Sequence, residues 1–153
     1  MNDDFHRPTF GSAVFYEDPR AAMEWLENAF GFARNMVISD QDGKLVHAEM
    51  RFGDGYITLG PKWADFVDIP ASIGGKNTQI IHTHLDSDID AHYARAKAAG
   101  AEILQAPEDQ FYGDRTYRAR DPGGHVWTFS QTVRHVSRED AEQASGLKIE
   151  GWH

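Results

Sequence analysis

Residues 120–131, RDPGGHVWTFSQ, contain a tight turn followed by a β-strand. The segment DPGG consists of residues that favour turns, and the residues after it alternate as expected for a strand. Because successive side chains of a strand point to opposite faces, Trp127 and Phe129 share one face and Thr128 lies on the other. We predict that the two aromatic side chains pack in the core under the helices and that His125, next to the turn, is exposed.

Outward from this strand, the same order of elements occurs twice along the chain. Each half contains a strand, a helix and three further strands, and one displacement along the sequence relates Gly31 to Gly100 and Ala22 to Ala91. Internal repetition of this kind decides the fold. The expected elements are strand 9–16, a helix starting at 18–19 and ending at Gly31, strands 34–39, 44–52 and 56–60, strand 78–85, a helix starting at 86–88 and ending at Gly100, and strands 102–105, 115–120 and 125–130.

Neither half can bury its sheet alone, so we predict that the two halves share one core. The expected class is α+β, with two tandem βαβββ modules forming a curved mixed sheet around a cup and the helices on the outside. In the tail, Ser137 and the acidic residues after it favour a short helix. The expected boundaries are 8–131 for a single domain, with modules 8–60 and 78–131 and a linker at 61–77, and 132–153 for a polar C-terminal tail.

The composition narrows the classes of function. The formal net charge of −9 opposes binding to nucleic acid and to anionic membrane surfaces, although it suits a cationic ligand at long range. The chain has no cysteine, which excludes disulfides and thiolate metal sites. Its acidic start lacks an apolar signal segment, and no apolar run approaches the ~20 residues of a membrane span. We therefore expect a cytoplasmic protein.

Several segments together resemble the glyoxalase, bleomycin-resistance and extradiol-dioxygenase superfamily, whose fold is called vicinal oxygen chelate. The resemblance covers about residues 8–131 and is closest to two-module bacterial members that are PhnB-like or bleomycin-resistance-like. It implies a cup that binds a small molecule, and a homodimer, because two-module chains of this family commonly pair. The segments that carry it are FGDG at 52–55, LGP at 59–61, AGA at 99–101, PEDQFYGDR at 107–115 and RDPGGHVW at 120–127.

Metal-using members of this family hold one divalent ion with His, Gln and Glu side chains from the first and last strands of the modules. In this chain the resemblance places those positions at about Gly11, at Thr58 or Leu59, at Ile80 and at Thr128. None of these is a usual ligand, because divalent metals favour carboxylate, imidazole or amide oxygen. We therefore expect no metal or other cofactor, and Thr128 marks a cup that has lost its ion.

A displaced divalent-metal site is the alternative. His82 and His84 are two residues apart on one strand and share a face, as do His47 and Glu49 on another strand. Such a site would use His82 and Glu49, with His47 as a third ligand, although a real site also needs supporting groups around its ligands. Otherwise His82 and His84 form hydrogen bonds in a polar pocket.

In the family, the strand face opposite Trp127 and Phe129 points into the cup. The alternation of side chains along the strands therefore predicts which residues line the cup. A guanidinium inside a cup is a partner for carboxylate or phosphate, whereas the alternative is that Arg118 only pairs with Glu49 or an acidic neighbour. Tyr112, near the mouth, either contacts a flat ligand or packs in a dimer together with Phe111. The predicted ligand-binding residues are Phe15, Glu49, His82, His84, Tyr112, Thr116, Arg118 and Thr128.

The sequence is compatible with three functions. The first is a small-molecule binding protein that sequesters an antibiotic or toxin without chemistry. The second is a glyoxalase-type lyase or isomerase, or a dioxygenase, either metal-dependent or metal-independent with His82 as the best candidate for a catalytic base. The third is a scaffold or regulator whose cup is filled by side chains.

Overall fold

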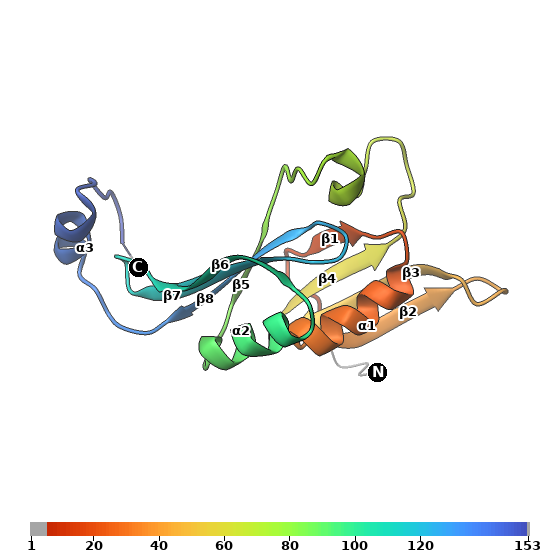
Figure 1. Ribbon diagram of the computed structural model, residues 1–153, viewed down its shortest axis with the longest axis horizontal. Coiled ribbons are helices and arrows are strands. Elements are labelled where there is room, and N and C mark those ends of the chain that lie inside the picture. Colours follow the sequence, from red (N-terminus) through yellow and green to blue (C-terminus); the bar gives the residue numbers. More distant parts are fainter. Residues whose placement is uncertain (1–5, 153) are drawn as a thin grey trace.

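The computed structural model describes residues 6–152, and its two halves follow one another along the long axis (Figure 1). The first half contains β1 (Ser12–Phe15), α1 (Pro19–Phe30), β2 (Ala33–Ser39), β3 (Leu45–Phe52) and β4 (Gly55–Gly60). The second contains β5 (Ile81–His84), α2 (Ile89–Ala98), β6 (Glu102–Asp109), β7 (Asp114–Arg120) and β8 (Val126–Thr132). Each half therefore has the predicted βαβββ order.

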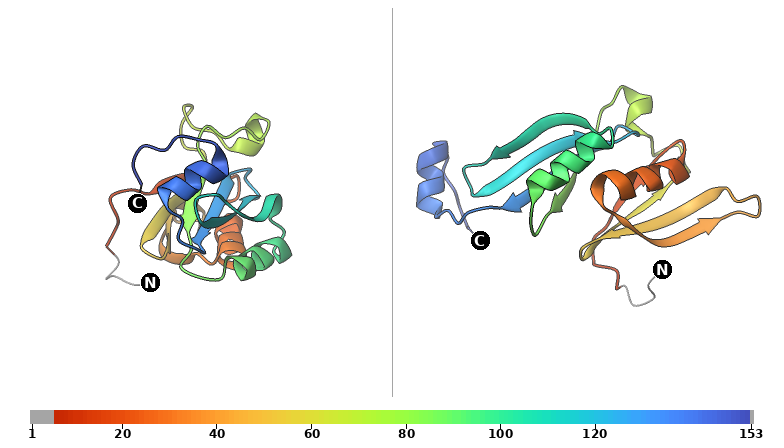
Figure 2. Two further views of the ribbon diagram at one scale, coloured as in Figure 1. Left: turned by 90° about the vertical axis from the view of Figure 1, so that its left-hand side faces the viewer. Right: turned by 60° about the horizontal axis from the view of Figure 1, so that its bottom comes forward.

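Each half forms its own four-stranded mixed sheet. The strand orders are β1-β4-β3-β2 and β5-β8-β7-β6, with the first strand of each sheet parallel to its neighbour and the other pairs antiparallel. The α+β class and the two tandem modules are thus confirmed. The sheets do not join or close in the described part of the chain, and each helix covers one face of its sheet and leaves the other open (Figure 2).

Local sequence signals set the ends of α1. The carboxylate of Asp18 accepts a hydrogen bond from the backbone N–H of Ala21, and Pro19 occupies the first turn, where its missing N–H costs nothing. Gly31 ends the helix in the left-handed conformation, with φ of 81°. These are the boundaries that the sequence predicts.

The two modules share one aromatic core. Trp127 and Phe129 of β8 are fully buried, which confirms their predicted place. Their rings lie 5.2 and 4.7 Å from the ring of Phe30, at the end of α1 in the other module. Tyr117 stacks on Phe129 at 5.0 Å. Contacts of this kind join the modules through their helix-covered faces, so the open faces of the sheets remain available.

The helices α1 and α2 meet near their C-terminal ends, and each binds C-terminal carbonyls of the other (Figures 1 and 2). The indole N–H of Trp25 donates to the carbonyl of Ala99 at 3.0 Å. In the opposite direction, the guanidinium of Arg95 donates to the carbonyls of Glu27 and Asn28, both at 2.8 Å. Because helix ends carry unpaired carbonyls, these bonds hold the modules together while satisfying both helices.

A second junction lies at the turn after β7. The carboxylate of Asp121 is buried and accepts bonds from the Tyr16 hydroxyl at 2.6 Å and the Trp127 indole at 2.9 Å. Its other oxygen accepts the backbone N–H groups of Gly123 and His125. The prediction that His125 is exposed is wrong: the residue is buried, because its Nε2 contacts the carbonyl oxygen of Phe15 at 2.9 Å.

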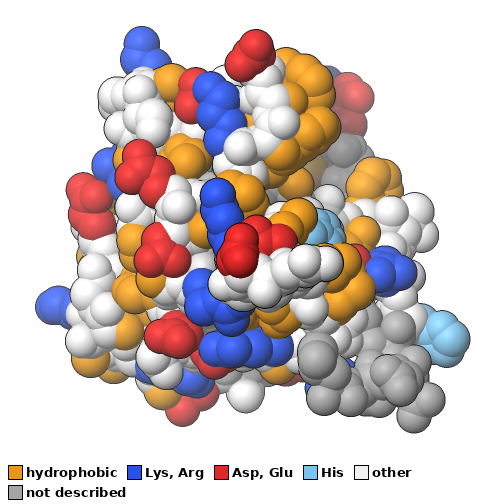
Figure 3. All heavy atoms as spheres, turned by 90° about the vertical axis from the view of Figure 1, so that its right-hand side faces the viewer, with side chains coloured by type: hydrophobic (Ala, Val, Ile, Leu, Met, Phe, Trp, Pro, Cys, Tyr) orange, Lys and Arg blue, Asp and Glu red, His pale blue; other side chains and the backbone are white. Residues whose placement is uncertain are grey.

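The linker and the tail lie outside the two sheets. The linker contains one short 3-10 helix, η1 (Pro70–Ile73), and two exposed aromatic side chains, Trp63 and Phe66. The space-filling view shows charges of both signs mixed with hydrophobic side chains on the face that carries the first module (Figure 3).

In the tail, helix α3 (Arg138–Ser145) lies beyond the second sheet (Figures 1 and 2), and the indole of Trp152 donates to the carbonyl of Val136. Within residues 6–152, no helix combines the length and apolar character needed to cross a bilayer.

Candidate functional site

A polar hollow of about 220 Å³ lies on the open face of the second sheet. The strand register places its central residues in one row: His82 of β5 is beside Thr128 of β8, which is beside Arg118 of β7, which is beside Gln105 of β6. All four side chains line the hollow. The alternation of the strands therefore brings together, on one surface, residues from all four strands of the second module.

Arg118 is the main cationic group of this hollow. Its Nε donates a hydrogen bond to the Thr128 hydroxyl at 2.9 Å, and no Asp or Glu within residues 6–152 forms a salt bridge with its guanidinium. The alternative pairing with Glu49 does not occur, because Glu49 lies on the first sheet and binds Arg7, at 2.8 Å between Nη2 and Oε1. The terminal nitrogens of Arg118 are therefore available to an anion.

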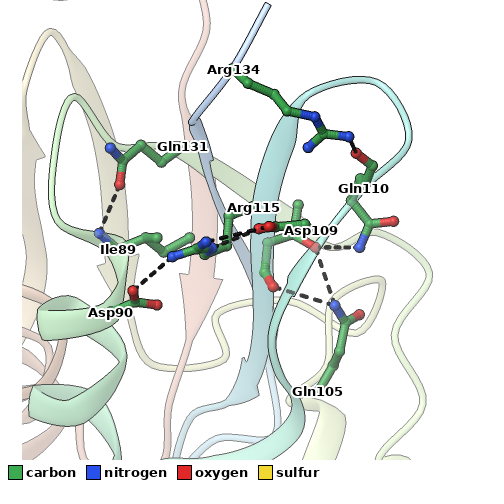
Figure 4. Close-up of polar contacts among 9 residues, drawn as sticks. Ile89, Asp90, Gln105, Asp109, Gln110, Arg115, Gln131 and Arg134 are labelled. Atoms are coloured by element: carbon green, nitrogen blue, oxygen red, sulfur yellow. Dashed lines mark hydrogen bonds and ion pairs between the residues drawn. The ribbon is translucent and has the colours of Figure 1, made fainter. Parts of the chain in front are cut away.

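Two amide side chains complete the polar wall. The Nε2 groups of Gln105 and Gln110 donate to the same hydroxyl, that of Thr116, at 3.1 and 3.0 Å. Figure 4 shows the two amides converging from β6 and from the loop after it. The backbone carbonyl of Gln110 in turn accepts a bond from the guanidinium of Arg134, which fixes this loop. Their remaining amide oxygens give the hollow acceptors as well as donors.

The base of this wall is held by ion pairs outside the hollow. Arg115 of β7 binds Asp109 at the end of β6 at 2.7 Å and Asp90 at the start of α2 at 2.8 Å (Figure 4). The guanidinium, mainly through its hydrogen bonds, holds the pKa of the Asp109 carboxyl below its usual range. Because these groups are exposed, the pairs position the loop more than they stabilise the fold.

Tyr112 lies at the edge of the hollow. Partial burial raises the pKa of its phenol, and the nearby carboxylate of Asp114 acts in the same direction, while Arg118 opposes them. The phenol therefore stays protonated at neutral pH and can donate one hydrogen bond. Its ring contacts that of Phe111 at 5.2 Å, so the loop presents an aromatic edge to the hollow.

The predicted lining divides between the two sheets. His82, Tyr112, Thr116, Arg118 and Thr128 surround the hollow. His84 lies at its margin, where it contacts the Ser130 hydroxyl at 3.3 Å. Phe15 and Glu49 belong to the first sheet, and Glu49 is buried under Arg7. Within one chain, the eight predicted residues thus form one cluster of five with His84 beside it, and Phe15 and Glu49 lie apart.

Four lining residues were not foreseen. Strand alternation does not assign a face to either glutamine, because Gln105 lies between two register shifts in β6 and Gln110 lies in the loop after that strand. Asp114 and Ser130 follow the same parity as Thr116 and Thr128, so alternation alone was a sufficient signal for them.

The metal positions implied by the resemblance fit a divalent ion poorly. In the first module the equivalent position is either Thr58 or Leu59. Thr58 pairs with Glu49 in the strand register, as Thr128 pairs with Arg118 in the second module, whereas Leu59 is buried in the core. Thr58 is therefore the equivalent position. At the equivalent position in the second module, the Thr128 hydroxyl already accepts a bond from a cationic guanidinium. A positive group at 2.9 Å opposes a second cation at that oxygen.

The displaced site is also divided between the sheets. His47 Nε2 lies 3.9 Å from the Glu49 carboxylate on β3, but His82 belongs to β5 of the other sheet. Across residues 6–152, no three His, Asp or Glu side chains come close enough together to hold a metal ion. One chain by itself therefore does not assemble the set of His82, Glu49 and His47.

The sequence and fold of this chain are similar to those of known proteins. The family model described as Glyoxalase/Bleomycin resistance protein/Dioxygenase superfamily matches residues 10–129. The chain belongs to this superfamily. Its sequence is 31% identical over 152 residues to an uncharacterized protein of Mycobacterium bovis, covering 94% of this chain and 96% of that protein.

Solved structures agree with this assignment. TioX from Micromonospora sp. ML1 has a TM-score of 0.65 and 28% identity, covering 85% of this chain and all of the other. A glyoxalase/bleomycin resistance protein/dioxygenase from Nocardioides has a TM-score of 0.59 and 20% identity, covering 86% and 88%. The first is similar in sequence as well as in fold, whereas the second shows the fold alone.

Proposed function

We propose that this superfamily member is a small-molecule binding protein whose hollow on the second sheet holds an anionic group of its ligand. The observation that carries the proposal is Arg118, a guanidinium fixed by Thr128 and bound to no carboxylate in the described structure. A guanidinium presents a planar pair of donors that matches a carboxylate or a phosphate. The net charge of the chain acts at long range, but the group inside the hollow selects what binds there.

The other lining residues have complementary roles in this proposal. The amides of Gln105 and Gln110 and the hydroxyl of Ser130 orient the polar part of the ligand by hydrogen bonds. The ring of Tyr112 covers a flat part of it. His82 borders the hollow from β5 and contributes a further donor or acceptor. In this proposal none of these residues makes or breaks a bond, and the protein sequesters an antibiotic or toxin.

Binding in this proposal needs no metal or other cofactor. The positions that would hold the ion carry glycine, isoleucine and two threonines, and the Thr128 hydroxyl is engaged by Arg118. A ligand anion would pair directly with the guanidinium instead. We expect the purified protein to contain no stoichiometric divalent metal, and its melting temperature to be unchanged by a chelator; one metal ion per chain would contradict this.

The open face of the second sheet leads us to propose a homodimer as well. A hollow of about 220 Å³ on an open sheet is small and shallow for a ligand site. A second copy covering this face would enclose it, and a specific interface of that kind buries over ~1,000 Å² in total. Light scattering at micromolar protein should give twice the mass of one chain, whereas a monomeric mass would contradict the dimer.

We place this protein among the two-module, PhnB-like or bleomycin-resistance-like members, acting in the cytoplasm. The βαβββ repeat supports the first part of this proposal, and a chain with no cysteine suits a reducing compartment.

The test of the proposed function is a calorimetric screen of small aromatic and aliphatic carboxylates, each paired with its uncharged amide. Carboxylates should bind more tightly than their amides, and Arg118→Ala should weaken carboxylate binding at least about tenfold, because hydrogen bonds to charged groups contribute about 1.5–3 kcal/mol. Arg138→Ala, in α3, is the matched control and should change nothing. Equal affinity of the Arg118→Ala variant and the unaltered protein would contradict the assignment.

A further inference from the structure

A second, larger cavity lies between the two modules. This groove has a volume of about 890 Å³ and is lined by the start of β1, the β3–β4 turn, β5 and the beginning of α2. It meets the hollow at His82, which lines both. Its volume falls within the range of small-molecule sites, and junctions between structural units are common places for them.

The groove has an aromatic floor and wall. Phe32 and Phe52 lie 5.2 Å apart, centre to centre, and His92 lies 6.1 Å from Phe52 at a right angle. Tyr56 lies over the backbone of Gly11, where an added Cβ would be 2.5 Å from the ring. The lining of the groove therefore contains several aromatic rings, which suits a flat aromatic ligand.

The groove is lined by the carboxylates of Asp54 and Asp86 and by three histidines. Among the residues that the structure describes, no lysine or arginine belongs to its lining. Arg95 approaches Phe52 near Gly31, but its guanidinium is engaged by two carbonyls of α1. Carboxylates beside half-buried aromatic rings are a combination that attracts organic cations.

We propose that the groove is a separate binding site for flat aromatic cations. The ring system of such a ligand stacks along Phe52 and Tyr56, and its positive charge lies near Asp54 and Asp86. The selectivity is opposite to that of the hollow, where Arg118 selects anions. The site exists within one chain and does not depend on the proposed function of the hollow.

Fluorescence titration with proflavine, a flat aromatic cation, tests this proposal. Acridine-9-carboxylate, an equally flat anion, is the matched ligand. Proflavine should bind with the higher affinity, and the double variant Asp54→Asn/Asp86→Asn should weaken it at least about twofold, since exposed charge pairs contribute about 0.2–1 kcal/mol each. Asp42→Asn, in the exposed turn between β2 and β3, should leave the affinity unchanged.

Two further variants separate the groove from the hollow. Tyr56→Leu should weaken proflavine about two- to fivefold, through the lost cation–π contact. Arg118→Ala should leave proflavine binding intact, so the outcome is independent of the carboxylate screen. The proposal is overturned if the anion binds as tightly as proflavine, if the Asp54→Asn/Asp86→Asn and Tyr56→Leu variants bind proflavine normally, or if Arg118→Ala abolishes proflavine binding.

Discussion

Arg118 donates from its Nε to the hydroxyl of Thr128 on the neighbouring strand, over 2.9 Å. The two residues are directly opposite each other in the antiparallel pair of β7 and β8. The hydroxyl thus fixes one edge of the guanidinium and leaves the terminal nitrogens for a ligand. In the first sheet, the equivalent pair is Glu49 and Thr58, and there the carboxylate is covered by Arg7. At this position, the open face of the first sheet therefore carries a carboxylate and that of the second sheet carries a guanidinium.

The Thr128 hydroxyl should matter for ligand binding more than for stability. Thr128→Val keeps the shape but removes the acceptor that orients Arg118, so carboxylate affinity should fall about fivefold, which corresponds to the ~1 kcal/mol of one hydrogen bond. Calorimetric titration measures this change. Thr58→Val, at the equivalent position of the first sheet, is the control, and an equal loss in both variants would refute the role of Thr128.

The buried carboxylate of Asp121 should be a major determinant of stability. Asp121→Ala leaves the Tyr16 hydroxyl and the Trp127 indole without their acceptor in the core, and unpaired buried groups cost about 1–3 kcal/mol each. We expect the free energy of unfolding in urea to fall by about 2–4 kcal/mol. Asp42→Ala, in an exposed turn, should cost far less; similar losses would show that Asp121 does not join the modules.

Stability should depend on pH through His92. Burial lowers the pKa of this imidazole, whose Nε2 contacts the Phe30 carbonyl at 2.8 Å and whose Nδ1 contacts the Tyr117 hydroxyl at 2.5 Å. Below about pH 6.5 the unfolded chain therefore binds the proton more readily than the folded one, and stability is lost as pH falls toward the folded pKa.

His92→Gln isolates this contribution, because the amide can keep one donor and one acceptor without titrating. As pH falls from about 7 to 5, the unaltered protein should lose more of its unfolding free energy than the His92→Gln variant does. A difference that stays constant across this range would contradict a neutral, half-buried imidazole.

The turn after β7 requires glycine for two reasons. Gly124 has φ of 85°, and an added Cβ would lie 2.9 Å from the backbone nitrogen of Ala71 in the linker. Gly43 has a similar φ of 82° with open space around it. Both alanine variants lose about 1 kcal/mol from the left-handed backbone, and Gly124→Ala should lose a further ~1–3 kcal/mol from the clash. Equal melting temperatures for the two variants would exclude close packing against the linker.

Much of the fold follows from local patterns in the sequence. The repeated order of elements and the cap residues Asp18 and Gly31 predicted both modules, because capping depends on neighbouring residues only. The packing of the modules was harder, since alternation identifies a buried face without identifying what covers it. The reciprocal bonds of Trp25 and Arg95 depend on contacts between distant segments, and nothing in the periodicity indicates them.

The lining of the hollow was predictable where strands are regular. Parity correctly placed Thr128, Arg118 and His82 around one hollow. It missed Gln105, because bulges in β6 change which side chains face the hollow. It also gave no sign of Arg7, which reaches Glu49 from a segment without regular structure.

The most direct test of the anion-binding hollow is the NMR signal of the Arg118 Nε–H group during titration with benzoate, compared with benzamide. The side-chain signal should shift with benzoate along a saturable curve, and Thr128→Val should reduce both the shift and the affinity. Benzamide should cause a much smaller change. A signal that does not move while benzoate binds elsewhere would contradict the claim that Arg118 forms the ligand site.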